Sequence, residues 1–300
     1  MDYFLERKFL RNTSLGRIMA IKAIVCLVLM ICCFLLLQYV FLDLIFAGQL
    51  TQTRALVITS YNWEYLFLLV LAYTFFMTLV VNFIGEVDKK FGPGVLLPLL
   101  LGKYRRPKEE ERIFMFMDLK SSTSIAEKLG HIMYSSFISD CFMDINHALF
   151  PCNAEVYQYV GDEIVVSWPA VEGLRDFSST RFFFTCEKYI QHRAQYYLSN
   201  YGIVPVFKAG MHIGTVTAVE IGEIKRDIAY HGDTLNTAAR IQGLCNEYGK
   251  RLLVSGYFFD RSGIEGHFPT REIATILLKG KSVPVRILSV ETTERYAIES

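Results

Sequence analysis

Residues 113 to 123 read Ile113-Phe114-Met115-Phe116-Met117-Asp118-Leu119-Lys120-Ser121-Ser122-Thr123, and this stretch decides the fold of the chain. Its first part is an apolar run that ends in a carboxylate, a pattern typical of a buried strand that holds Asp118 at its end. The hydroxyl residues Ser121, Ser122 and Thr123 follow and begin a predicted helix. Because the first backbone N–H groups of a helix have no partner within it, they can bind phosphate. The stretch therefore predicts a strand, a carboxylate and a phosphate-binding helix start in direct succession.

A second carboxylate, Asp162, lies in the stretch Tyr159-Val160-Gly161-Asp162-Glu163. The Gly-Asp turn separates two strand-like runs, 155–159 and 164–168, and predicts a β-hairpin. Two carboxylates at rigid strand ends can hold a pair of divalent cations, which proteins use for phosphoryl chemistry. Taken singly, Asp118 is also compatible with a helix N-cap, and Asp162 with an ordinary turn residue.

Strands and helices alternate from residue 113 onward. The order of strand, helix, hairpin, helix and strand is that of the split βαβ, or ferredoxin-like, arrangement. The predicted fold class is therefore α+β, with a mixed sheet and helices packed on one of its faces. The remaining predicted elements are helices over 123–150 (interrupted near Gly130), 178–199 and 234–248, and strands over 206–212, 215–221, 252–255, 273–278 and 285–290.

Two long apolar runs, residues 23–42 and 65–84, precede this region. At 1.5 Å per residue each is about 30 Å long as a helix, which matches the hydrocarbon core of a bilayer. We therefore expect two transmembrane helices; the alternative is a pair of buried helices in a soluble protein. Basic residues lie before the first run and after the second, whereas the loop between them contains only Arg54. By the positive-inside rule, both termini face the cytoplasm.

The expected location is thus the cell (inner) membrane, with a multi-pass anchor in contact with membrane lipid and the region after it in the cytoplasm. The formal net charge is +1, so no nucleic-acid partner is expected.

Four blocks of the chain together resemble the catalytic domain of class III nucleotidyl (adenylate/guanylate) cyclases, in the small bacterial membrane-anchored type. The resemblance covers about residues 110–292. The blocks are Phe116-Met117-Asp118-Leu119-Lys120-Ser121-Ser122-Thr123, Tyr159-Val160-Gly161-Asp162-Glu163, His231-Gly232-Asp233-Thr234-Leu235-Asn236-Thr237-Ala238-Ala239-Arg240, and Leu278-Lys279-Gly280-Lys281 followed by Pro284-Val285.

The resemblance implies a membrane-anchored adenylate cyclase that converts ATP to 3′,5′-cyclic AMP and pyrophosphate by two-metal catalysis. Asp118, Asp162 and the carbonyl of Leu119 would bind two Mg²⁺ or Mn²⁺ ions. The hydroxyl stretch Ser121, Ser122, Thr123 would contact the phosphates.

In this family an asparagine orients the ribose and an arginine stabilises charge on the α-phosphate, and the matching residues are Asn236 and Arg240. Lys279 would contact the terminal phosphates. These three residues come from one subunit and the two aspartates from its partner. The resemblance therefore implies a homodimer with active sites at the interface.

The positions that read the base depart from the family pattern. Adenylyl cyclases usually carry lysine, and guanylyl cyclases glutamate, where this chain has Gln158. The second position, usually aspartate or threonine in adenylyl cyclases, is Ala229. An amide can donate or accept, so Gln158 could suit either purine. Because the glutamate of guanylyl cyclases is absent, ATP is the expected substrate, with a guanylate or dual-specificity cyclase as the alternative. A further alternative is a catalytically silent membrane receptor that binds nucleotide.

The expected organisation has five parts. They are a cytoplasmic N-terminal lead (1–22), a membrane region with two transmembrane helices (23–84), a juxtamembrane junction (85–109), the cyclase catalytic domain (110–292) and a C-terminal tail (293–300).

Overall fold

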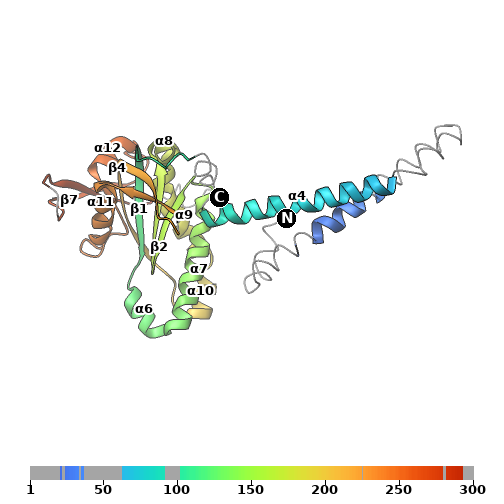
Figure 1. Ribbon diagram of the computed structural model, residues 1–300. Helices are drawn as coiled ribbons and strands as arrows, with labels where there is room; N and C mark the ends of the chain where they lie inside the picture. The colour runs from blue at the N-terminus through green and yellow to red at the C-terminus, as the bar shows by residue number, and fades with distance from the viewer. Residues whose placement is uncertain are drawn as a thin grey trace, which may run out of the picture. The chain divides into compact units, whose positions relative to one another are not determined.

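The computed structural model describes residues 21, 24–33, 35–36, 63–91, 102–224, 226–279 and 282–292 (Figure 1). The chain divides into two compact units, residues 1–96 and 97–300. The predicted C-terminal tail, 293–300, lies outside the described residues, and so does the predicted N-terminal lead, 1–22, apart from residue 21.

The first unit contains one long apolar helix, α4 (Trp63–Phe91). Its window Leu68–Gly85 has a mean hydropathy of 2.1, and none of it is buried, so within the described residues it is the helix long and apolar enough to cross a membrane. A shorter apolar helix, Ile24–Cys33, runs beside it, since the Thr78 hydroxyl lies 3.7 Å from the Cys26 sulfur. Residues 37–42 of the predicted first span lie outside the described residues, and the two-span anchor therefore stays a prediction.

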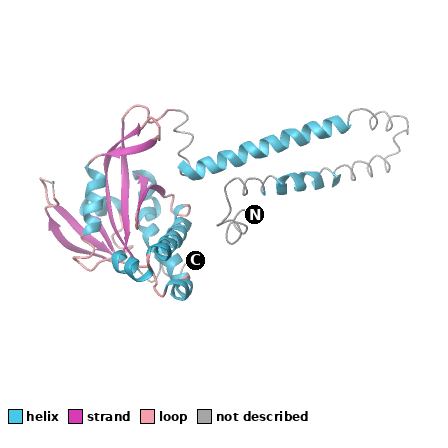
Figure 2. Ribbon diagram, turned by 60° about the horizontal axis from the view of Figure 1, so that its bottom comes forward, coloured by secondary structure: helices cyan, strands magenta, loops and turns pink. Residues whose placement is uncertain are grey.

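The second unit is built on a sheet of eight strands, and strands are drawn in magenta in Figure 2. Their order is β2-β3-β1-β4-β6-β8-β7, with β5 paired to β4. β4 and β6 are parallel, while the other neighbours are antiparallel. The predicted mixed sheet is thus confirmed. The strands are β1 (Lys108–Leu119), β2 (Glu155–Val160), β3 (Glu163–Pro169), β4 (Phe207–Ile221), β5 (Asp227–His231), β6 (Leu252–Ser255), β7 (Thr270–Ile276) and β8 (Val285–Val290).

Alternation along β1 divides the sheet into two faces. Ile113, Met115 and Met117 are fully buried in the main core. Phe114 lies on the opposite face, in a smaller cluster, and Asp118 shares that face because successive side chains of a strand alternate.

Most helices cover the face that carries the main core. Phe137, Phe182 and Phe258 reach this core from three of them. The helices are α6 (Ser122–Leu129), α7 (His131–Leu149), α8 (Ala170–Leu174), α9 (Ser178–His192), α10 (Ala194–Tyr201) and α12 (Gly256–Ser262), with a short 3₁₀ turn (Arg175–Phe177) before α9.

Helix α11 (Asp233–Gly243) packs on the other face, through Ala238 and Ile241 (Figure 1). The expectation of helices on one face only was therefore wrong. Two glycines of β4 allow the helix to pack close to the sheet. A Cβ at Gly210 would lie 2.1 Å from the backbone nitrogen of Gln242, and a Cβ at Gly214 would lie 2.6 Å from the Thr234 hydroxyl.

Several element boundaries differ from those predicted. The strands expected over 206–212 and 215–221 are one strand, β4, because Gly214 stays in the ladder opposite Arg112. The short strand β5 was not predicted. The helix expected over 178–199 breaks at Arg193, and the helix expected over 234–248 ends at Gly243.

Candidate active site

Asp118 and Asp162 come together although they lie on different elements. Asp118 is near the end of β1, and its cross-strand neighbour is Glu163 on β3. Asp162 occupies the turn between β2 and β3, where Gly161 has a φ of +64°. Burial raises the pKa of Asp118, and the adjacent Asp162 carboxyl raises it further, against a hydrogen bond with Lys208 that lowers it. The two carboxyl groups therefore interact directly.

Two donors hold one oxygen of Asp118. The Lys208 ammonium, from β4, lies 3.1 Å from Oδ2. The Gln242 amide, from α11, donates to the same oxygen at 3.1 Å. Glu163 belongs to the same group, because burial and then the charges of Asp118 and Asp162 raise its pKa. The site thus holds three carboxylates and one ammonium group.

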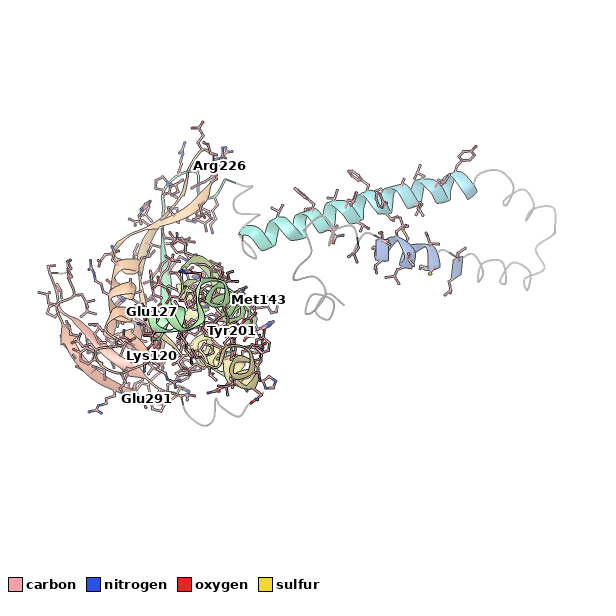
Figure 3. The ribbon with its side chains drawn as sticks, turned by 90° about the horizontal axis from the view of Figure 1, so that it is seen from below. Lys120, Glu127, Met143, Tyr201, Arg226 and Glu291 are labelled. Atoms are coloured by element: carbon pink, nitrogen blue, oxygen red, sulfur yellow. The ribbon has the colours of Figure 1, made fainter. Side chains whose placement is uncertain are left out.

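The start of α6 lies beside these carboxylates. Ser121 occupies the N-cap position with a left-handed backbone (φ 59°), and its side chain makes no capping hydrogen bond. Tyr134, from α7, connects α6 to the carboxylates. Burial raises its pKa, the charges of Asp162 and Asp118 raise it further, and a hydrogen bond with Ser122 lowers it. Thr123 is exposed on the first turn, and Lys120 follows the end of β1 (Figure 3).

One oxygen of these carboxylates has no partner among the described residues. Oδ2 of Asp162 is buried and makes no hydrogen bond with them. A buried carboxylate oxygen without a donor is costly unless a cation satisfies it. Carboxylate oxygens are the ligands that Mg²⁺ and Mn²⁺ prefer. The residues present therefore fit a divalent cation.

No set of three or more His, Cys, Asp or Glu among the described residues is arranged to hold a metal ion by itself. This agrees with the way proteins bind Mg²⁺, through one or two carboxylates together with phosphates of the substrate. Leu119, whose carbonyl was the expected third ligand, is the last residue of β1, and its side chain is buried in the main core.

Asn236 and Arg240 lie four residues apart on α11 and so share one side of the helix. Ala238, midway between them, faces the sheet, and the pair therefore faces away from it. Asn236 is exposed, and Nη1 of Arg240 is buried without a hydrogen-bond partner among the residues that the structure describes. Within the described part of this single chain, neither residue bonds to Asp118 or Asp162.

The two predicted base-reading residues lie on different faces of the sheet. Gln158 is exposed opposite Val165, on the face of the α11 cluster, after a bulge in β2. Ala229 pairs with Val219, and its neighbour Tyr230 pairs with Ala218. Tyr230 therefore lies on the same face of the sheet as Gln158, and the centroid of its ring is 5.2 Å from that of Tyr157. Lys279 is exposed in the loop after β7, and the described residues give it no ion pair.

Sequence reasoning missed three residues of this site, Lys208, Gln242 and Tyr134. Lys208 carried little signal, because it alternates with the apolar residues Phe207, Ala209 and Met211, the pattern of a strand whose polar face meets solvent. Gln242 and Tyr134 carried none, because a glutamine or tyrosine within a helix is common.

Comparison with known proteins finds similarity to adenylate cyclases. The chain is similar to adenylate cyclase 2 of Rhizobium meliloti (strain 1021), with 33% identity over 221 residues that make up 74% of this chain and 61% of the relative. It thus spans about three fifths of that protein's length. The adenylate cyclase of Anabaena cylindrica is 25% identical over 183 residues, 59% of this chain and 36% of that protein. No family model matches the chain.

Solved structures share the fold at low sequence identity. The adenylyl cyclase CyaB from P. aeruginosa superposes with a TM-score of 0.55 and 18% identity, over 63% of this chain and 98% of that one. A bacterial light-regulated adenylyl cyclase gives a TM-score of 0.61 and 16% identity, over 77% and 66%. The guanylyl cyclase Cya2 gives 0.51 and 19%, over 61% and 93%. These likenesses confirm the cyclase catalytic-domain fold expected for the second unit.

Proposed function

We propose that this chain, whose second unit shares the fold of solved adenylyl cyclases, is a class III nucleotidyl cyclase that converts ATP into 3′,5′-cyclic AMP and pyrophosphate. The observation that carries the proposal is the meeting of Asp118 and Asp162 beside the start of α6, with Oδ2 of Asp162 buried and unpartnered. The 33% identity to an adenylate cyclase supports the choice of reaction.

Asp118 and Asp162 would hold two Mg²⁺ or Mn²⁺ ions, with the carbonyl of Leu119 as an added ligand. Bound there, such cations would lower the pKa of the ribose 3′-hydroxyl and neutralise charge on the triphosphate. The chain contributes the ionised carboxylates, and the first backbone N–H groups of α6, near Ser121, Ser122 and Thr123, would receive phosphate oxygens.

Arg240, Asn236 and Lys279 would complete the site of a partner chain in a homodimer. The Arg240 guanidinium would face the α-phosphate, and its planar, permanent charge suits a pentacoordinate phosphorus better than an ammonium does. Asn236 would orient the ribose and Lys279 the terminal phosphates. Support comes from α11, which turns Asn236 and Arg240 away from the sheet that holds Asp118.

Membrane anchoring is part of the proposal. The apolar window Leu68–Gly85 of α4 supports at least one span. We propose that residues 23–84 form a two-helix anchor in the inner membrane, that 85–109 form a junction, and that residues 110–292 act in the cytoplasm.

GTP is the second candidate substrate, since Gln158 is exposed and its amide can pair with either purine. Ala229 offers no side-chain partner for adenine, which further weakens selection.

The test is turnover by the purified full chain in detergent with ATP or GTP and Mn²⁺, scored for cyclic nucleotide. Asp118→Ala and Asp162→Ala should each abolish product while the melting transition is retained. Arg226→Gln, at the tip of the β4–β5 hairpin and far from Lys120 in Figure 3, is the matched charge control and should keep activity. Product formation by either aspartate variant would contradict the assignment, and no product from the wild-type chain would indicate a silent nucleotide-binding protein.

A further inference from the structure

Lys208 is a buried lysine in the middle of a strand. It is 9% exposed, and its neighbours Phe207 and Ala209 point to the main core at 2% and 0% exposure. A lysine is almost never buried unless it is paired, because removing the ammonium group from water is costly. The burial of Lys208 therefore requires a partner of opposite charge.

Its described partner is Asp118, and the contact selects one oxygen. Nζ of Lys208 and Nε2 of Gln242 both lie 3.1 Å from Oδ2 of Asp118. This oxygen thus receives two donors from two elements, β4 and α11. The other oxygen, Oδ1, makes no hydrogen bond or ion pair among the described residues and is left for a ligand.

Lys208 also provides positive charge within a group of carboxylates. Asp118 and Asp162 interact directly. Their charges raise the pKa of Glu163, and the charge of Lys208 lowers it. Register places Glu163, Asp118 and Lys208 side by side across β3, β1 and β4. The ammonium group of Lys208 cancels one unit of the negative charge that the three carboxylates carry, and this weakens the attraction of the group for a cation.

We propose that Lys208 is a positioning residue and resident counter-ion of this site. It holds Oδ2 of Asp118 so that Oδ1 is presented to the cation. Its positive charge keeps the affinity for the cation low until the nucleotide brings the negative charge of its phosphates. The inference rests on the proposed function, since it concerns the same carboxylates.

The test is binding of Mn²⁺ alone to the full chain in detergent, without nucleotide, with free Mn²⁺ counted by electron paramagnetic resonance. Lys208→Met should bind Mn²⁺ tighter, on the order of tenfold, because one repelling charge is removed. Lys208→Arg, which keeps the charge, should bind as the wild type does. In the cyclase assay, Lys208→Met should lower kcat, since Asp118 is no longer held.

Two further variants separate charge from hydrogen bonding. Gln242→Leu removes the other donor to Oδ2 without a change in charge, and its Mn²⁺ affinity should not rise. Glu163→Gln removes a negative charge and should bind Mn²⁺ more weakly, which tests the charge argument even if Lys208→Met does not fold. A residue that merely supports the fold would lose affinity on substitution and would never gain it.

The outcomes distinguish this inference from the proposed function. If Asp162→Ala abolishes Mn²⁺ binding but Lys208→Met leaves it unchanged or weaker, the role of Lys208 is overturned and the carboxylate site stands. If the wild type binds no Mn²⁺, or Asp162→Ala binds it normally, the carboxylate site itself is wrong and the role of Lys208 falls with it.

Discussion

Gln242 donates from α11 to Oδ2 of Asp118 at 3.1 Å, so the helix that carries Asn236 and Arg240 also touches the carboxylate half of the site in its own chain. The two residues proposed for the partner's site face away from the sheet, while Gln242 faces it. In the proposed dimer, each α11 would therefore contact the carboxylates of one active site and supply the arginine of the other.

Mixing two inactive variants tests this arrangement. Asp118→Ala and Arg240→Ala should each be inactive alone, but an equal mixture should recover about a quarter of wild-type activity, because half of the dimers are mixed and each has one intact site. The measurement is cyclic product after subunit exchange, with dimers verified by chemical cross-linking. Mixing Asp118→Ala with Asp162→Ala is the control and should recover nothing. Verified mixed dimers without activity would exclude a shared site.

Substrate choice should depend on Gln158. We expect a preference for ATP over GTP on the order of tenfold in kcat/KM, because the neutral amide can pair with either base and Ala229 adds no polar partner. Gln158→Glu should shift the preference toward GTP, since a carboxylate accepts from the N1–H and N2–H groups of guanine. Gln158→Lys should shift it toward ATP. A strict preference that neither substitution changes would mean that Gln158 does not read the base.

The topology of the membrane region can be read with reporter fusions. A fusion after Gln52, between the two predicted spans, should report the periplasmic side, and one after Ser300 the cytoplasm, because basic residues cluster outside the two apolar runs. A fusion at Asp2 is the control and should agree with Ser300. Reporters on the same side at Gln52 and Ser300 would overturn the two-span anchor.

The buried carboxylate Asp144 should be critical for stability. It is 1% exposed and accepts from Arg193 and from the Tyr197 hydroxyl, each at 2.6 Å. Asp144→Asn removes the negative partner and should cost about 3 kcal/mol in the free energy of unfolding, as expected when a buried pair is broken. The control is Arg226→Gln, which removes the exposed arginine from an ion pair with Glu220 and should cost less than about 0.5 kcal/mol. Equal losses for the two variants, measured by urea unfolding, would contradict this role.

Glu187 should make the protein less stable as the pH rises. Burial raises its pKa to about 7, although the charge of Arg251 opposes the shift. Nη1 of Arg251 lies 2.7 Å from Oε1 of Glu187, as an ion pair without the geometry of a hydrogen bond. The pair therefore offsets the cost of burial only in part.

The folded state therefore holds a proton that the unfolded state has lost. The resulting penalty is absent below about pH 4.5 and grows until about pH 7. Glu187→Gln should remove it and stabilise the fold at pH 8 by on the order of 2 kcal/mol, with little effect at pH 4.5. Unfolding curves of wild type and variant over this range are the measurement. Parallel pH profiles would show that Glu187 is ionised in the fold without cost.

Local patterns were sufficient for the elements that hold the two aspartates. The apolar run before Asp118 and the Gly-Asp turn before Glu163 are short-range signals, and β1 and the β2–β3 hairpin lie where they predict. The continuity of β4 through Gly214 and the seat of α11 were not readable in this way. They depend on whether a glycine faces a helix, and that is known only once the helix is placed.

The sequence by itself determined the class of fold, the apolar segments and the two carboxylates, because periodicity and turn chemistry act over a few residues. Only the tertiary structure decided which groups surround those carboxylates. Gln242 is 124 positions from Asp118 in the chain, and Lys208 reaches Asp118 through the register of β1 and β4. Such contacts follow from strand register and helix packing, in which a shift of one residue would move every side chain to the other face.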